Sequence, residues 1–451
     1  MSFYRVLSLL VIFGLILFSS PTSATQNNEV FEIKAPSNCL DKNIVESEEL
    51  SLIELIKIGI CNNPSLASDY MLYQENKDNL SKSKKEYYPQ INLTSNINKN
   101  STTTEGYNTN SNSPYNINLG LSMLLYDFGG RSARIDSFKS YLSKSGFEYN
   151  NALQDLILSI HTAYFKLLGA QEDLISAKAN EAMYKKTYDE AKRKYDVGLV
   201  ALNDKLQTQT TYEQSKLKVI ETENNVKQYQ GDLAVILNLS PKTTFKLKEP
   251  PKDRDLTALD KKENIDTLIE QASLNRLEIQ AQKEAINQAN ADLRNLRASR
   301  YGSFNLSADS NYSNTWKYES SYKRDNQIGI QYRLPLFTGF DTKYSISATK
   351  KKRQRERYIL DEIKNNIKNE VWSAYHNYKT SLKSYDVSKK LLKSAEENEK
   401  VAFKSYEIGK TDIINLLTAE SQLAQARDTL VNSFYTVLIN KATLYRSIGR
   451  F

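Results

Sequence analysis

The sequence predicts an α+β membrane protein in which a β-barrel is continued by a tube of long α-helices. Three observations lead to this fold class. The chain of 451 residues is internally duplicated, each copy carries two strands of membrane-spanning length, and each copy carries one very long helix. Four strands cannot close a membrane barrel, so several chains must contribute. A dimer would close a narrow barrel filled by side chains, whereas a trimer would supply twelve strands and leave an open lumen.

The duplication is visible in short segments that recur at a constant distance. Tyr195–Gly198 (YDVG) is answered by Tyr406–Gly409 (YEIG), about 211 residues later. Such self-similarity marks a duplicated structural unit. We therefore expect a first repeat over residues 51–245, a linker over 246–261 and a second repeat over 262–451, each repeat beginning with a helix.

The first residues are typical of an export signal. Arg5 precedes an apolar stretch from Val6 to Phe18, and small residues that suit a cleavage site follow it. The apolar stretch is too short to span a bilayer comfortably, although a retained anchor is the alternative. We expect a cleaved signal peptide over residues 1–24 and an N-terminal periplasmic segment over residues 25–50.

The chain has two cysteines, Cys39 and Cys61, and an exported chain folds in an oxidising compartment. Both cysteines lie outside the duplicated strand-and-helix blocks. We expect a disulfide that fixes the N-terminal segment to the first helix. Two unpaired, buried thiols are the alternative, because a sequence does not give the distance between them.

Alternating hydrophobicity marks two pairs of strands. Ile117, Leu119 and Leu121 alternate with polar or small residues, and the same period of two recurs around Ile328 and Ile330. This period places one face against an apolar environment and the other against water. Segments of about nine to eleven residues fit a tilted membrane strand. A soluble hairpin packed on its own helices is the alternative. The strands are expected over residues 90–104, 113–127, 302–315 and 325–337.

Long helices follow each strand pair, over residues 131–196 and 341–407, with shorter partners over 202–238 and 412–449. At 1.5 Å per residue, each long helix would reach about 100 Å. Their heptad pattern places small residues along one seam, which favours antiparallel coiled-coil pairing. An exported coiled-coil structural or adhesive envelope protein would explain the heptads equally well. It would not explain the strands.

Composition argues against other functions. The net charge of +8 comes from evenly spread lysines on an exported chain, which disfavours a nucleic-acid partner. His161 and His376 are widely separated, and neither has a second ligand at the spacing of a metal site. We find no nucleophile motif, phosphate-binding loop or paired carboxylates. We therefore expect no enzyme activity, no metal and no cofactor.

Five motifs, in order and partly duplicated, resemble those of the TolC family of outer-membrane efflux and secretion channels, and the resemblance covers almost the whole mature chain. They are a helix start, a helix-to-strand junction, two strand-to-helix turns and a helical tip, at Asn62–Leu66, Tyr88–Pro89, Leu125–Arg131, Leu334–Gly339 and Tyr195–Asp204. The resemblance implies a homotrimeric channel-tunnel of a Gram-negative outer membrane, with a twelve-stranded barrel and a periplasmic helical barrel.

The resemblance also implies partners and a function. The channel would meet a periplasmic adaptor (membrane fusion) protein and an inner-membrane pump of the RND, ABC or MFS type at its helical tips. It would be the export duct of a tripartite efflux or type I secretion system, through which drugs or proteins pass passively. The implied adaptor-docking residues lie in the two tip turns, at Val197, Gly198, Leu199, Ile408, Gly409 and Lys410.

The periplasmic gate departs from the family pattern. Family members often carry aspartates just after the second tip, where this chain has Asn415 and Thr418, and Asp412 lies one turn earlier. We therefore expect a gate built on polar contacts rather than on an acidic ring. Its expected residues are Asp204, Tyr406, Asp412, Asn415 and Thr418.

Basic residues gather at all four junctions between strands and helices. Three copies would form a positive collar at the periplasmic membrane surface, where anionic lipid headgroups are attractive partners. A solvated helix face without a preferred partner is the alternative. The collar residues are Lys84, Lys85, Arg131, Arg134, Arg297, Arg300, Lys351 and Arg353.

Overall fold

The computed structural model describes residues 49–103, 105–106, 110–248, 264–315 and 322–450, all within one compact unit that spans residues 35–451. The predicted signal peptide and Cys39 lie outside the described residues, so the signal peptide and the disulfide between Cys39 and Cys61 stay predictions. No helix in the described part of the chain is both long and apolar enough to cross a membrane.

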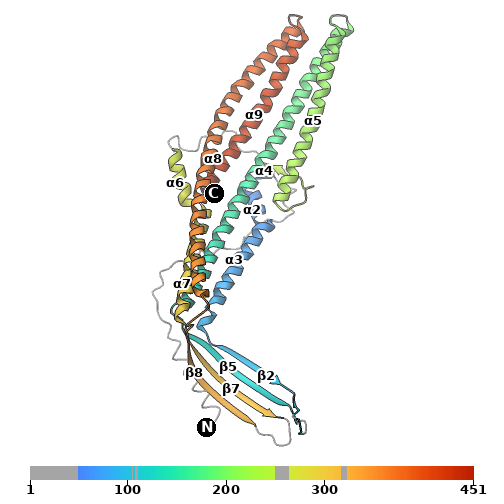
Figure 1. Ribbon diagram of the computed structural model, residues 1–451. Coiled ribbons are helices and arrows are strands. Elements are labelled where there is room, and N and C mark those ends of the chain that lie inside the picture. Colours follow the sequence, from blue (N-terminus) through green and yellow to red (C-terminus); the bar gives the residue numbers. More distant parts are fainter. Residues whose placement is uncertain (1–48, 104, 107–109, 249–263, 316–321, 451) are drawn as a thin grey trace. The chain divides into compact units, whose positions relative to one another are not determined.

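Four strands form one antiparallel sheet in the order β2–β5–β7–β8 (Figure 1). Their bounds are Gln90–Ile97 for β2, Pro114–Tyr126 for β5, Ser303–Thr315 for β7 and Lys323–Arg333 for β8. The two repeats meet in the middle of this sheet, where β5 pairs with β7. Strands β2 and β8 are its edges, and each pairs on one side only within this sheet.

The first and fourth strands are shorter than predicted. The continuous strand expected over 90–104 ends at Ile97, because the facing strand begins at Pro114, which has no N–H for the ladder. Beyond it, β3 (Asn100–Thr102) pairs with β4 (Asn110–Asn112). The strand expected over 325–337 ends at Arg333, shortly before Pro335, which cannot donate to a ladder.

The register of the sheet separates apolar from polar side chains. Residues that face each other in an antiparallel ladder share one face of the sheet. One row across all four strands consists of Ile91, Leu121, Ala308 and Ile328. The next row, on the opposite face, consists of Asn92, Gly120, Asp309 and Gln327. The predicted alternation is therefore a property of the whole sheet, which has one apolar and one polar face.

Aromatic side chains lie at both ends of the apolar band. At the end that joins the helices, Phe304 stacks on Tyr332 with 4.4 Å between ring centroids. At the other end, Tyr312 lies 6.1 Å from both Tyr115 and Tyr322. Between Phe304 and Tyr312, β7 covers about 27 Å at roughly 3.4 Å per residue. This matches the apolar band of about 25 Å, flanked by aromatic girdles, that membrane barrels present to lipid.

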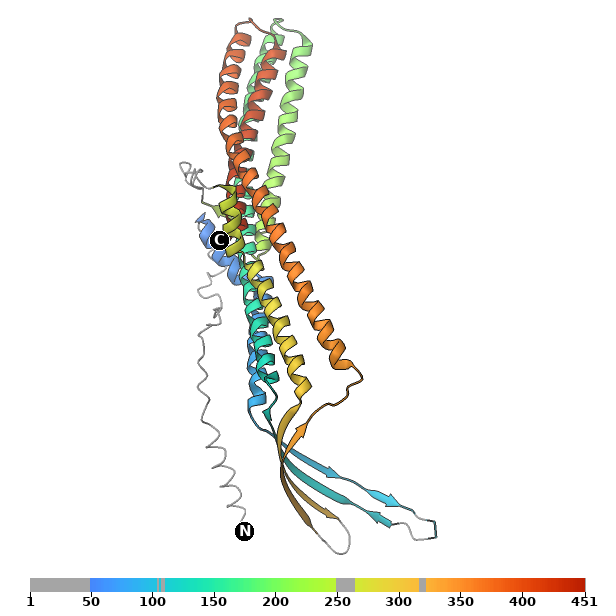
Figure 2. The same ribbon diagram turned by 60° about the vertical axis from the view of Figure 1, so that its left-hand side comes forward.

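The long helices are α4 (Gly130–Asp196) and α8 (Asp341–Glu407), each of 67 residues. Each forms a hairpin with a shorter partner, α5 (Leu202–Ile236) or α9 (Ile413–Ser447), and both views show the partners side by side (Figures 1 and 2). The two hairpins contact each other through α4 and α9. Small residues of the predicted seams are buried in these contacts, among them Ala163, Ala170, Ala177, Ala374, Ser381 and Ser388.

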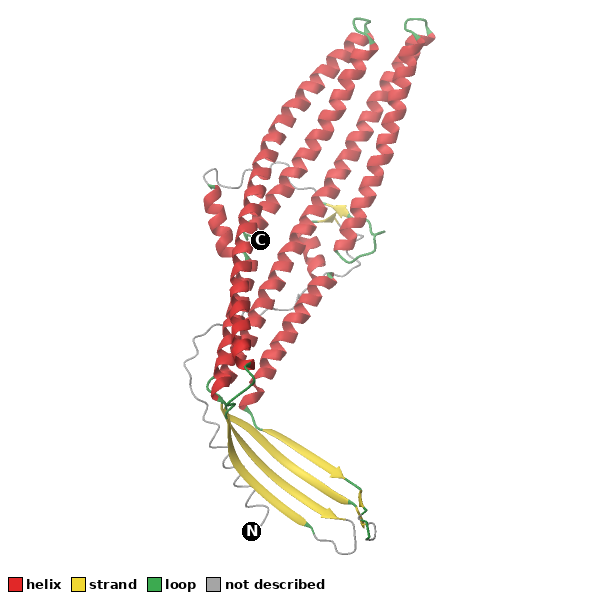
Figure 3. Cartoon of the chain, viewed as in Figure 1, coloured by secondary structure: helices red, strands yellow, loops and turns green. Residues whose placement is uncertain are grey.

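Shorter helices pack beside the halves of α4 and α8 that lie nearer the sheet (Figure 3). They are α2 (Leu52–Asn62), α3 (Pro64–Ser83), α6 (Ile265–Asn275) and α7 (Leu277–Ala298). Helix α3 begins sharply because the Asn63 side chain accepts the Leu66 N–H at 3.0 Å and Pro64 is the first helical residue. The predicted linker begins with β6 (Lys246–Leu247), which pairs in parallel with β1 (Glu49–Leu50).

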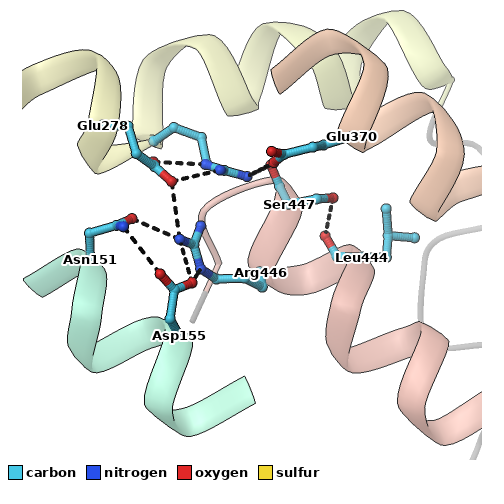
Figure 4. A network of polar contacts seen from close by, with 8 residues as sticks. Asn151, Asp155, Glu278, Glu370, Leu444, Arg446 and Ser447 are labelled. Carbon is cyan, nitrogen blue, oxygen red and sulfur yellow. Dashed lines mark hydrogen bonds and ion pairs between the residues drawn. The ribbon is translucent and has the colours of Figure 1, made fainter. Parts of the chain in front are cut away.

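An ionic network ties helices of both repeats together (Figure 4). The buried Arg446 of α9 donates to Asp155 of α4 at 2.8 Å and lies 3.1 Å from Glu278 of α7. Arg276, also buried, bonds Glu278 at 2.7 Å and Glu370 of α8 at 2.8 Å. Burial alone would raise the pKa of Glu278, but the hydrogen bond from Arg276, a backbone N–H and the charges of Arg276 and Arg446 together outweigh it and hold that pKa at about 2. The network fixes four helices at one level of the bundle.

Candidate functional site

Each long helix ends in a glycine turn. At the end of α4, Gly198 has φ +79°, and its N–H donates to the Tyr195 carbonyl at 2.9 Å. The Leu199 N–H donates to the Lys194 carbonyl at 2.8 Å. These two bonds form a Schellman motif, which satisfies carbonyls that otherwise lack partners at a helix C-terminus. The positive φ explains why glycine occupies this position.

The second tip repeats this geometry. Gly409 has φ +76° and donates to the Tyr406 carbonyl at 3.1 Å, and the Lys410 N–H donates to the Ser405 carbonyl at 2.8 Å. The helix that follows, α9, is preceded by Asp412, whose carboxylate accepts the Asn415 N–H at 2.9 Å. Asp412 therefore acts as a helix cap in this chain.

All six predicted docking residues are exposed at the two tips. Three of them are apolar, and the exposed fractions of Val197, Leu199 and Ile408 are 70%, 73% and 66%. Apolar side chains grouped at the free end of a helical hairpin are typical of a protein–protein contact surface.

A lysine joins the two hairpins next to their tips. Lys194, in the last turn of α4, donates through Nζ to the carbonyl of Tyr406 at 2.6 Å and to that of Glu407 at 3.1 Å. Its ammonium also lies 4.3 Å from the centre of the Tyr406 ring. These carbonyls form the negative end of α8, so the lysine adds a favourable charge–dipole interaction.

Tyr406 is the buried centre of this contact. Only 3% of its surface is exposed, and it packs with Ile413 and Leu416. Its hydroxyl has no hydrogen-bond partner among the described residues. Burial raises the pKa of Tyr406 to about 12, and the nearby carboxylates of Asp204 and Glu190 add to the shift.

The structure thus brings two of the five predicted gate residues together. Asp204, half-buried in the first turn of α5, lies near Tyr406. Asp412, Asn415 and Thr418 are exposed at the start of α9. Asp412 accepts the Asn415 N–H, and the Thr418 hydroxyl donates to the Ile414 carbonyl, so these bonds stay local. Sequence reasoning missed Lys194. The position that corresponds to Lys194 in the second copy is Ser405, so a comparison of the two copies does not single out this lysine.

A polar layer lies deeper in the contact between α4 and α9. The Thr187 hydroxyl donates to Glu420, which is completely buried, and Arg427 donates to Asn180 at 2.6 Å one heptad away. Burial raises the pKa of Glu420 to about 7, although the bond from Thr187 works in the opposite direction. The contact between the hairpins therefore contains an acid that titrates near neutral pH.

Three of the predicted collar residues are bound within the chain. The Arg131 guanidinium lies 3.8 Å from the centre of the Tyr87 ring and donates to the carbonyls of Glu86 and Leu124. Arg134 forms ion pairs with Glu86 and with Asp127. Arg353 is half-buried and donates to Asn290 at 3.4 Å. The other five collar residues, Lys84, Lys85, Arg297, Arg300 and Lys351, are exposed.

Within the ranges that the structure describes, no three His, Cys, Asp or Glu side chains gather as a metal site.

Comparisons with known proteins place this geometry among outer-membrane channels. The family model described as outer membrane efflux protein matches residues 55–239 and 268–450. Protein CyaE of Bordetella pertussis is 24% identical over 393 residues, which are 84% of this chain and 80% of CyaE. Outer membrane protein TolC of Salmonella enteritidis is 24% identical over 311 residues, 67% of this chain and 62% of TolC. The crystal structure of a membrane protein from Pseudomonas aeruginosa has the same fold, with a TM-score of 0.78, 18% identity and coverage of 93% of this chain and 99% of that one.

Proposed function

Because the chain belongs to the outer membrane efflux protein family, we propose that three copies of it form an export duct gated at the helical tips. The protein is a TolC-type export duct of the outer membrane, and it works with components of an export pump. The finer features of the proposal are the trimer, the docking of an adaptor and the position of the gate.

The two-faced sheet is the observation that carries the proposal. Its apolar face suits lipid and its polar face suits a water-filled lumen. Unpaired strand edges are not tolerated in a bilayer, so the edges β2 and β8 need partners from other copies. Two copies would make a barrel that side chains fill, whereas three copies make a twelve-stranded barrel with an open lumen.

The tips support contact with an adaptor. Val197, Leu199 and Ile408 are apolar and exposed, and each lies in one of the two hydrogen-bonded glycine turns. A periplasmic adaptor that covers them would connect the duct to an inner-membrane pump of the RND, ABC or MFS type. That pump supplies the energy, and drugs or proteins then pass passively through the lumen.

The contact between the two hairpins is where the gate of the duct would lie. Lys194 and Tyr406 join the hairpin α4–α5 to the hairpin α8–α9, so the tips separate only when this contact breaks. Asp204 lies near the tyrosine and helps to raise its pKa. Adaptor binding at the adjacent turns would favour the separated state.

Two measurements test the proposal. Purified full-length protein should form heat-modifiable trimers that conduct ions in planar bilayers. A chain that never conducts would favour the exported coiled-coil structural or adhesive protein instead. Crosslinking in the cell envelope should recover an adaptor and a pump with the wild-type chain, and their identity would separate drug efflux from protein secretion.

A matched pair of variants tests the docking surface. Leu199→Asp places a charge in the apolar tip and should abolish adaptor recovery while trimers stay in the membrane. Asn203→Asp adds the same charge at an exposed polar position nearby and should leave recovery unchanged. Equal recovery with both variants would place the docking surface elsewhere.

A further inference from the structure

Four exposed cations surround the junction between the helices and the sheet. Lys84 and Lys85 lie in the 3₁₀ turn Lys84–Tyr87 that follows α3. Arg297 lies in the last turn of α7, and Arg300 lies in the 3₁₀ turn Ser299–Tyr301 that follows it. All four are exposed, and none forms an ion pair or a side-chain hydrogen bond within the described part of the chain. We call these four residues the junction collar.

Three acidic residues near the collar are already bound to other cations. Glu86 and Asp127 bind Arg134, and Asp136 binds Arg294 at 2.8 Å.

Farther along α7 and α8, Asp292 binds Lys352 at 3.3 Å, and Glu356 binds Arg355 at 2.8 Å. The chain therefore offers the junction collar no unpaired carboxylate among these neighbours. Its positive charge remains available for a ligand from outside the chain.

The collar lies at the depth of lipid headgroups if the sheet spans the membrane. Arg300 precedes the first residue of β7, Ser303, and Lys85 lies close to the start of β2, Gln90. Exposed aromatic residues lie between the cations and the strands: Tyr87, Tyr88 and Tyr301. Tyrosines at this position mark the boundary between apolar lipid and water in membrane barrels.

Lys351 does not belong to this group. It lies about 15 Å along α8 from Asp341, at 1.5 Å per residue. That distance exceeds the screening length of about 8 Å at physiological salt, so its attraction to a headgroup at the junction is weak.

We propose that the junction collar binds the phosphate groups of anionic phospholipids in the periplasmic leaflet. This inference rests on the proposed placement of the sheet in the membrane. Arginine can bind a phosphate through two parallel N–H bonds, and the lysines act as point charges beside it. Each well-placed cation changes the affinity about fivefold, so a lipid that contacts two of them gains about 25-fold.

Native mass spectrometry of the full-length trimer tests the proposal. Trimers extracted from vesicles of phosphatidylethanolamine and phosphatidylglycerol should retain phosphatidylglycerol preferentially. The variant Lys84→Gln/Lys85→Gln/Arg297→Gln/Arg300→Gln should lose about 25-fold of this preference. The variant Lys84→Arg/Lys85→Arg/Arg297→Lys/Arg300→Lys, which keeps the charges, should retain most of it.

The matched control removes four exposed lysines on the hairpins, through Lys185→Gln, Lys192→Gln, Lys390→Gln and Lys393→Gln. It makes the same change in net charge far from the junction and should keep the preference. Equal retention of both lipids by the wild type, or an equal loss in the control variant, would overturn the proposal. Loss of trimers in the glutamine variant alone would also overturn it, because the collar would then contact a second copy. Failure of the duct itself is a separate result, visible as absent conductance in planar bilayers.

Discussion

Replacing Lys194 by methionine should weaken the contact between the two hairpins and open the periplasmic end of the duct. Methionine keeps an unbranched apolar side chain but cannot donate to the carbonyls of Tyr406 and Glu407, which lie 2.6 Å and 3.1 Å from the lysine Nζ. A hydrogen bond from a charged donor contributes about 1.5–3 kcal/mol. The ammonium above the Tyr406 ring, at 4.3 Å, adds about 0.5–1 kcal/mol.

These gains are offset in part. Holding a lysine in one rotamer costs up to about 2 kcal/mol, and the side chain is only half-buried, so water competes for its bonds. We expect a net contribution of about 2 kcal/mol per chain. Since 1.4 kcal/mol corresponds to a factor of ten, the ratio of open to closed hairpins should rise about 30-fold.

Single-channel recording in planar bilayers measures this ratio as the fraction of time that the channel is open. Lys192→Met is the matched control, because Lys192 is exposed, carries the same charge and forms no ion pair or hydrogen bond with the part of the chain that the structure describes. It should leave the open fraction unchanged. An unchanged open fraction in Lys194→Met trimers that remain assembled would refute the assignment of the gate to this contact.

Three further changes test other parts of the structure. Gly409→Val should strain a turn at φ +76° by about 1–2 kcal/mol and should abolish export while trimers remain. Gly409→Asn should keep export, because asparagine tolerates positive φ. Glu420 has a folded pKa of about 7, above its ordinary 4.5, so the packed hairpins should lose about 3 kcal/mol as pH rises from 4.5 to 7. The melting temperature should therefore fall more over this range in the wild type than in Glu420→Gln, in which the raised pKa values of Asp173 and Asp428 remain. Arg446→Met removes the bonds to Asp155 and Glu278, but Glu278 keeps its bond to Arg276. The trimer should therefore lose about 2–3 kcal/mol of stability, less than the 3–5 kcal/mol expected when a buried charge is left unpaired. A lower temperature of trimer dissociation would measure this loss.

The sequence contains most of what determines the strands and the helix ends. A period of two places Ile117, Leu119 and Leu121 on one face, and the register confirms that they share it with apolar residues of other strands. Glycines 198 and 409 fix the ends of the long helices because only a residue that adopts positive φ easily closes the Schellman turn. Strand ends were less accurate, since a proline on the facing strand decides where β2 stops.

Side-chain partners between distant segments could not be predicted. Lys194 and Tyr406 are 212 residues apart, and nothing near either residue indicates that they meet. The collar residues show the same limit of prediction from sequence. Arg131 and Arg297 look alike in the sequence, but only Arg131 finds carbonyls and an aromatic ring within the fold. Whether a cation is bound or available depends on tertiary contacts that local patterns do not encode.

The most direct test of the gated duct is a reversible crosslink across the tip contact. Lys194→Cys and Glu407→Cys, joined in the assembled trimer by a short bis-maleimide with a reducible spacer, should abolish channel openings in planar bilayers, and reductant should restore them. The parent chain, without the introduced cysteines, should be unaffected by the same treatment. Trimers that conduct equally before crosslinking, after crosslinking and after reduction would contradict a gate formed by the two hairpins.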